Sequence, residues 1–251
     1  MDDGTIIIAA DGDTILHIKD PVFHLDQRYR CSRSVLRAES DYFDRLLDPS
    51  RWKEGIALED KFQQLLNDSP DQASPSLSEL PEILLSEIGV YVQDSSTSRM
   101  ATELFLNLLH HRDRSAPSTA WPVSRSESMR LTVQLALIAE FFLAMDCIKE
   151  YLKLLDWSSA LPTSDANTPG DLMELQNRQA LLVGLMLGDS KVVKICSANL
   201  ITDGSKTWTG QYSESDDAAK DLEPPWSPLP RGIEGTVEDP YSVRPHYNCL
   251  H

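Results

Sequence analysis

The stretch YRCSRSVLRAESDYFDRLL, residues 29–47, decides the fold. The segment 28–32 alternates polar and apolar side chains with the period of a strand, and 35–40 follows at once with helical character. Ser40 is a residue type preferred at a helix N-cap, and the apolar residues after it have helical spacing. Pro49 lies just beyond the end of that helix. The stretch therefore predicts a strand followed by two short helices.

Further strands are predicted on both sides of this stretch. Residues 5–9 and the alternating run 14–18 indicate two strands that meet at the turn Asp11-Gly12-Asp13, and 83–85 indicates another. Residues 67–79, NDSPDQASPSLSE, contain almost no apolar side chain. They predict a flexible loop inside the domain.

The second half of the chain has the periodicity of helices. Residues 100–111 carry one apolar face, and 131–155 are apolar almost all round at first, which predicts a buried helical hairpin. Asp146 is the expected cap of the second helix in that hairpin. After a linker at 158–170, the segment 171–208 predicts a helical extension.

Two local signals mark the ends of the extension's first helix. Asp171 and Glu174 approximate a capping box, and Gly188 is placed to end the helix. Residues 190–201 then predict one more amphipathic helix.

The last 43 residues, 209–251, hold six of the fifteen prolines and carry three basic and eight acidic side chains, a net charge of −5. Such a segment buries too little apolar surface to fold, so we expect a disordered acidic tail. Residues 224–231, PPWSPLPR, could alternatively adopt a polyproline II conformation and dock on an aromatic groove.

Composition excludes several classes of function. The chain has 251 residues, a hydrophobic content of 41% and a net charge of −16, so a direct nucleic-acid partner is not expected. The N-terminus lacks the features of a secretion signal, and the most apolar run, 131–145, is shorter than the roughly 20 residues that cross a membrane. No membrane association is expected.

The four cysteines are dispersed and lack the short spacing with which a local segment binds zinc. They suggest reduced thiols in the cytoplasm or nucleus. No metal and no cofactor are expected. The cysteines are Cys31, Cys147, Cys196 and Cys249.

Three motifs could suggest other chemistry, and each has a simpler interpretation. Ser50-x-x-Lys53 and Lys206-Thr207 resemble two sequence elements of penicillin-recognising serine hydrolases. The Ser-Asp-Asn element of those enzymes is incomplete here and the spacing between the elements is wrong, which favours surface turns. His110-His111 has neighbouring rings that cannot chelate one metal, and cationic capping of a helix end is favoured. Asp11-Gly12-Asp13 lacks the remaining ligands of a calcium loop.

Other short motifs concern modification and pairing. Asn67-Asp68-Ser69 matches a glycosylation acceptor, which needs the secretory pathway to be used. Serines that precede proline at 69, 74 and 227 are candidates for phosphorylation. Ile6, Ile7 and Ile8 could form an edge strand that pairs with a partner chain, or a strand that completes the chain's own sheet.

Taken in order, these segments resemble the BTB/POZ domain. The resemblance rests on Asp13-Thr14-x-Leu16-x-Ile18, Tyr29-x-Cys31-Ser32-x-x-Val35-Leu36, Ser40-x-Tyr42-Phe43-x-x-Leu46-Leu47, and Leu137-Ile138-Ala139-Glu140-Phe141-Phe142. The segment ALLVGLMLGDSKVVKICSANLI is similar to the helical region that often follows this domain in proteins of fungal type. Ser32 stands where the family usually has His, and Cys31 where Val or Ala is common. The family-signature core residues are Asp13, Leu16, Ile18, Tyr29, Cys31, Val35, Leu36, Ser40, Tyr42, Phe43, Leu47, Ala139 and Phe142.

The resemblance implies an α+β domain at 5–157, a small mixed β-sheet flanked by helices. It implies no catalytic site, and a function in self-association, with a possible homodimer, or in docking of protein partners. A second expectation is a substrate adaptor that binds a cullin scaffold of a ubiquitin ligase. A hydrolytic enzyme is the alternative from a different class.

Overall fold

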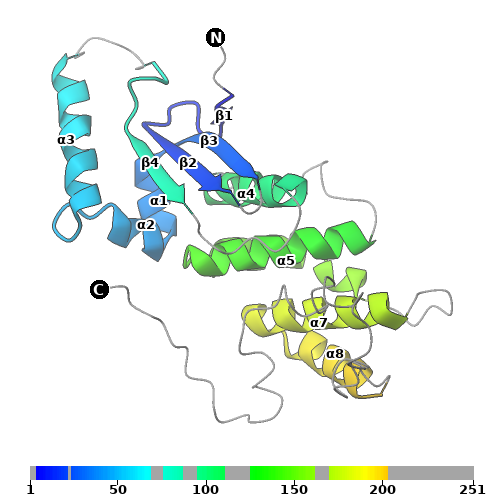
Figure 1. The fold of residues 1–251 in the computed structure, drawn as a ribbon. Helices are drawn as coiled ribbons and strands as arrows, with labels where there is room; N and C mark the ends of the chain where they lie inside the picture. Colours follow the sequence, from blue (N-terminus) through cyan, green and yellow to red (C-terminus); the bar gives the residue numbers. More distant parts are fainter. Residues whose placement is uncertain are drawn as a thin grey trace, which may run out of the picture.

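The computed structural model describes residues 4–21, 24–68, 76–86, 95–110, 125–161 and 170–202. These residues form a mixed α+β fold with one four-stranded sheet and eight α-helices (Figure 1). The strands are β1 (Ile6–Ile7), β2 (Thr14–Asp20), β3 (Leu25–Cys31) and β4 (Glu82–Ser86). The helices are α1 (Arg33–Glu39), α2 (Asp41–Leu46), α3 (Lys53–Asp68), α4 (Ser95–His110), α5 (Arg125–Phe141), α6 (Met145–Leu154), α7 (Gly170–Leu187) and α8 (Ser190–Thr202).

The sheet has the order β1-β3-β2-β4, in which β2 and β3 are antiparallel while β1 and β4 run parallel to their neighbours. One row across the sheet shows how its buried face is built. Leu16 lies opposite Tyr29 on one side and Ile83 on the other, and Tyr29 lies opposite Ile6. Because side chains alternate along a strand, this row defines the face that the helices cover.

Helices α4, α5, α7 and α8 are stacked below that face of the sheet, while α3 lies to one side of it (Figure 1). Helix α4 packs against β3 and α5, and α5 also packs against α6 and α7. Helix α8 packs against α7. Side chains of α7 and α8, such as Ala180 and Cys196, belong to the same hydrophobic cluster as the sheet. The C-terminal helical pair is therefore an integral part of the core.

Several predicted elements are confirmed with shifted boundaries. Strand β1 is shorter than the predicted 5–9, β3 begins before 28, and α4 begins before 100. The hairpin of α5 and α6 and the final helix α8 are confirmed. The predicted linker loses its first residues to a 3₁₀ turn, Trp157–Ala160. The predicted tail, 209–251, lies outside the described residues.

Two capping predictions are wrong. The N-cap of α6 is Ala144, and Asp146 lies within the first turn, where its carboxylate accepts a hydrogen bond from Lys149 Nζ at 2.9 Å. Helix α7 begins at Gly170, so Asp171 is inside the helix rather than before it. The Glu174 carboxylate accepts a hydrogen bond from Arg178 rather than closing a capping box with Asp171.

Helix α3 was not predicted, and it occupies the first two residues of the expected loop 67–79. Its link to the domain is mainly polar. The guanidinium of Arg33 donates to Glu59 Oε2 at 2.7 Å and lies 4.2 Å above the centre of the Phe62 ring. Gly55 also fits closely, since a Cβ there would lie 2.7 Å from the carbonyl oxygen of Asp48. Of the apolar side chains of α3 that the structure describes, only Leu58 lies in the core cluster.

Helices α5 and α7 end in the same hydrogen-bonding pattern. At the end of α5, Leu143 N–H donates to Glu140 O and Ala144 N–H donates to Ala139 O. Both helices form a Schellman motif, in which the first residue past the cap has positive φ and is usually glycine. That residue is Gly188 after α7, with φ of 69°, but Leu143 after α5, with φ of 50°. A leucine in this region costs about 1–2 kcal/mol.

Substitutions at the two helix ends should affect the free energy of unfolding differently. We expect Gly188→Ala to lower the free energy of unfolding by about 1–2 kcal/mol, because no atom crowds a Cβ there and only backbone strain is added. We expect Leu143→Gly to change it by less than about 1 kcal/mol in either direction, since the relief of strain is offset by the flexible unfolded state of glycine and by the loss of the buried part of the leucine side chain. Urea unfolding measures both, and a loss above about 1 kcal/mol for Leu143→Gly would contradict this account.

Candidate interaction surface

The signature residues lie mainly in the interior. Asp13 ends the turn before β2, and its Oδ1 accepts a hydrogen bond of 2.7 Å from Arg33 N–H at the start of α1. Asp13, Val35 and Tyr42 are half-buried. The buried members are Leu16, Ile18, Tyr29, Cys31, Leu36, Ser40, Phe43, Leu47, Ala139 and Phe142.

Ser40 joins the two halves of the signature. Its Oγ accepts a hydrogen bond from Phe43 N–H at 3.2 Å, which confirms the predicted N-cap of α2. The same hydroxyl donates to the carbonyl oxygen of Phe142 at 2.6 Å, 102 positions along the chain. Ser40 is buried, so both bonds form away from water. The start of α2 is thereby fixed to the end of α5.

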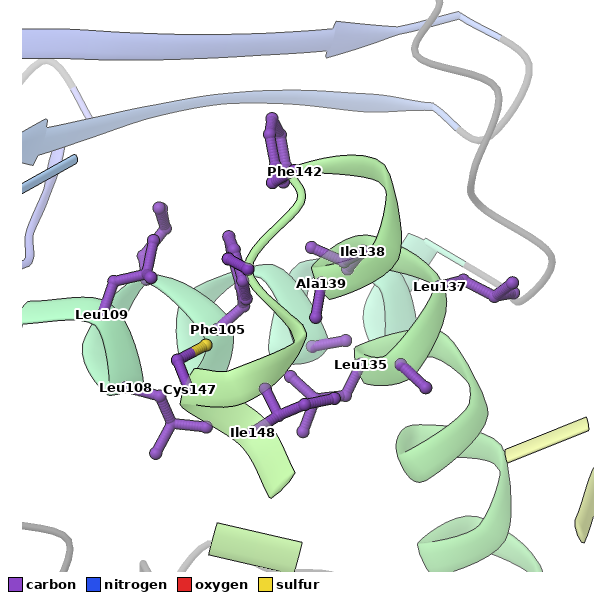
Figure 2. Close-up of a cluster of buried hydrophobic side chains, with 14 of the residues drawn as sticks. Phe105, Leu108, Leu109, Leu135, Leu137, Ile138, Ala139, Phe142, Cys147 and Ile148 are labelled. Carbon is purple, nitrogen blue, oxygen red and sulfur yellow. The ribbon is translucent and has the colours of Figure 1, made fainter. Parts of the chain in front are cut away.

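A stack of aromatic rings reinforces this junction. The rings of Phe43 and Phe142 are stacked with centroids 5.0 Å apart, and Phe105 of α4 stacks on Phe142 at 5.4 Å. Figure 2 shows Phe142 projecting from the end of α5 toward the strands, above Phe105. Tyr42 meets Phe142 edge-on at 5.3 Å. Such ring pairs add to the stabilisation from buried area.

We expect Ser40→Ala to lower the free energy of unfolding by about 2 kcal/mol, since it removes a helix cap and leaves a buried carbonyl without its donor. Ser50→Ala is the matched control. The Ser50 hydroxyl donates to the Asp48 carboxylate in a solvent-exposed turn, so its loss should change the free energy of unfolding by less than about 0.5 kcal/mol. Urea unfolding of the two variants tests this, and equal effects would refute the role of Ser40.

Half-exposed apolar side chains surround the junction at the surface. Tyr42 and Phe141 lie with ring centroids 5.3 Å apart, and Leu143 follows at the turn with 41% of its surface exposed. Burial raises the pKa of the Tyr42 phenol, so the ring is neutral there. We call Tyr42, Leu46, Phe141, Leu143 and Met145 the turn patch. Leu46, the last residue of α2, and Met145, the first residue of α6, pack against the core.

The outer face of the sheet carries charged side chains instead. His17 of β2 lies between two carboxylates, with Nδ1 2.7 Å from Glu82 Oε1 and Nε2 2.7 Å from Asp26 Oδ1. Arg28 donates to Glu82 Oε2 at 3.0 Å. The contacts link β3, β2 and β4. On the same face, Leu84 is 57% exposed.

The network around His17 makes the free energy of unfolding depend on pH in the acid range. The hydrogen bond from His17 lowers the pKa of Asp26 below its ordinary value. A carboxyl whose pKa is lower in the folded state stabilises the fold above its unfolded pKa of about 3.9 and loses that effect as the pH falls through the folded pKa. Asp26→Asn should therefore weaken the loss of stability below about pH 5.

Urea unfolding over this acid range, with Asp11→Asn as an exposed turn control, measures the effect. If Asp26→Asn and wild type lose stability in parallel, the network does not contribute.

The isoleucines at the N-terminus take different positions. Ile6 and Ile7 form β1, which runs parallel to β3 with Ile6 opposite Tyr29. Ile8 is buried in the core, and its N–H donates to Arg30 O at 3.0 Å. Ile7 faces solvent on the strand at the edge of the sheet. The chain thus uses this strand in its own sheet.

His110 does not act as a cationic cap, so that expectation is wrong. Its Nε2 accepts a hydrogen bond of 3.0 Å from Ser32 N–H, and Nδ1 lies 2.8 Å from the carbonyl oxygen of Leu106. An accepting Nε2 carries no proton, so the ring is neutral with hydrogen on Nδ1. His110 thereby links the end of α4 to the junction of β3 and α1.

The other chemical motifs are not assembled by the described residues. Ser50 Oγ donates to Asp48 Oδ1 at 2.6 Å within a turn, while Lys206, Thr207 and His111 lie outside the described residues. In the described part of the chain, no three His, Cys, Asp or Glu side chains are grouped to hold a metal ion. Within the same residues, no helix has the length and apolar character needed to cross a membrane.

Sequence reasoning missed Leu143, Arg33 and the network around His17. Alternating charged residues on 17–19 and 26–28 were the available signal for the network, but strand register is needed to pair them.

Comparison with known proteins does not add an assignment: no family model, no curated protein and no solved structure matches the chain.

Proposed function

We propose that this chain is a non-catalytic protein-interaction module of the BTB/POZ type. The observation that carries the proposal is the junction at Ser40. Residues that define the resemblance in the first 47 positions bond and stack with Phe142, which defines it in the second half. A chance resemblance between separate segments would not require such contacts.

The order of elements also supports the proposal. An antiparallel pair, β2 and β3, is followed by α1 and α2, then by β4, and then by the hairpin of α5 and α6 after α4. This is the order that the resemblance implies, with α3 as an addition between α2 and β4. The pair α7 and α8 lies where the resemblance expects a helical extension.

The buried thiols are consistent with a binding role. Burial raises the pKa of the Cys196 thiol to about 11 and that of Cys31 higher still, so both keep their protons at neutral pH and are poor nucleophiles. The exposed features are instead apolar side chains, in the turn patch and at Ile7 and Leu84, of the kind that bury on association.

Substrate adaptor for a cullin-based ubiquitin ligase is the second candidate. It is favoured by the packing of α7 against α5, which makes the helical extension and the domain one continuous body that could present a single surface to a scaffold. The cullin scaffold is a proposed partner, and cytoplasm or nucleus is the proposed location.

Affinity purification of the tagged full-length chain after cross-linking in cells, quantified by mass spectrometry against the tag alone, tests both candidates. We expect one or a few proteins to be retained in amounts comparable to the chain. A cullin among them supports the adaptor, and other proteins without a cullin support the simpler module. If neither another protein nor a second copy of the chain is cross-linked to it, the proposal fails.

A further inference from the structure

Helix α8 keeps one face exposed from its first turn to its last. In Figure 1 it lies on the far side of α7 from the sheet, and its other face, with Val192, Cys196 and Leu200, is buried. The exposed residues recur every three or four positions, which is the spacing of a single helix face. We call them the α8 stripe: Lys191, Lys194, Ile195, Ala198, Ile201 and Thr202.

The second half of the α8 stripe is apolar. Ile201 is 71% exposed and Ile195 is 37% exposed, and the exposed Ala198 lies between them. Single apolar residues at a surface are common, whereas neighbours on one helix face offer a continuous area that a partner segment can bury.

The first half of the α8 stripe is basic. Of the eight α-helices, α8 alone contains basic residues and no acidic one. Lys191 and Lys194 are exposed, and neither forms an ion pair with another described residue. Positive charge at the start of a helix opposes the helix dipole, so these lysines do not stabilise α8 itself.

The acidic residues around α8 leave the two lysines available. Asp189 caps the helix, because its Oδ1 accepts hydrogen bonds of 3.1 and 3.2 Å from backbone N–H groups of the first turn. Glu174 of α7 pairs with Arg178 at 2.7 Å. The two helices are antiparallel, so Asp171 at the start of α7 and Asp203 after the end of α8 belong to the end of the stripe away from the lysines.

The predicted tail carries a segment of complementary chemistry. Residues 213–223, SESDDAAKDLE, contain five acidic side chains and one basic side chain, a net charge of −4. Leu222 and Trp226 add apolar side chains at the end of this segment. A segment too polar to fold by itself can order on a surface of opposite charge that also buries its apolar residues.

The length of chain between α8 and this segment fits the stripe. Helix α8 ends at Thr202, and 203–213 supply eleven residues before Glu214. When extended they reach at most about 40 Å, whereas Lys191 lies about 17 Å back along the helix. The tether therefore holds the segment near the stripe at an effective concentration of about a millimolar.

We propose that residues 213–226 dock on the α8 stripe of the same chain. The acidic part of the segment faces the two lysines, while Leu222 and Trp226 cover the isoleucines of the stripe. The inference does not depend on the proposed function. It has a consequence for any protein that binds the helical extension at α8, which must compete with the tail.

Cross-linking of the purified full-length chain with a water-soluble carbodiimide tests the proposal, because this reagent joins a lysine amine to a carboxylate only where the two touch. We expect Lys191 and Lys194 to be linked to carboxylates of 213–223 about fivefold more often than Lys153, an exposed lysine of α6. Mass spectrometry of the linked peptides measures these yields.

Two substitutions that take no part in the coupling reaction test whether the apolar contacts hold the segment. Ile201→Asn and Trp226→Ala should each lower the yield at the two lysines about threefold, because each removes apolar area from the contact. Trp226→Ala leaves α8 itself unaltered. Leu154→Asn, at a leucine that is 63% exposed near the end of α6, is the matched control and should leave the yield unchanged.

Mixing the chain with an isotope-labelled copy before cross-linking shows whether both linked residues belong to one molecule. Links confined to single molecules support the proposal, and links that join labelled to unlabelled copies reject docking within one chain. The proposal is also overturned if the two lysines form no links to 213–223, if Lys153 is linked equally often, or if neither Ile201→Asn nor Trp226→Ala lowers the yield.

Discussion

The hydroxyl of Ser40 is the interaction on which the rest of the fold depends, because it satisfies two backbone groups from distant parts of the chain. It caps α2 and holds the end of α5, and the rings of Phe43, Phe142 and Phe105 stack behind it. Without that constraint the short helix α2 would lose its cap and depend on the packing of Phe43, because its own few hydrogen bonds do not by themselves stabilise a helix of six residues. The position of the turn patch follows from the same contact.

Much of this arrangement could be predicted from the sequence. Alternation and capping chemistry are local, so β2, α2 and the α5–α6 hairpin are confirmed at the positions that these patterns indicate. Helix α3 was missed although Leu58, Phe62 and Leu65 have helical spacing in the sequence. Its attachment through Arg33, which lies in another element, could not be read from the segment itself. The role of His110 depends on a backbone N–H that is 78 positions away, which no local pattern reveals.

The candidate surface was harder to predict than the core. A signature made of buried residues says where a chain folds back on itself, but an exposed leucine in a sequence has no distinguishing pattern. Leu143 becomes informative only when its φ of 50° and its exposure are known together. The sheet's outer face gives the same lesson, since His17 is an ordinary strand residue until register places Asp26 and Glu82 beside it.

The distribution of the buried cysteines has a practical consequence. Cys31 lies in β3, Cys147 in α6 and Cys196 in α8, and all three are buried cysteines that form no disulfide with one another. A thiol reagent can reach each of them only when its own part of the protein opens, because the reaction needs an accessible thiolate. The natural sequence therefore supplies three separate reporters, and labelling rates resolved by peptide would show whether sheet, hairpin and C-terminal helices open as one unit or in stages.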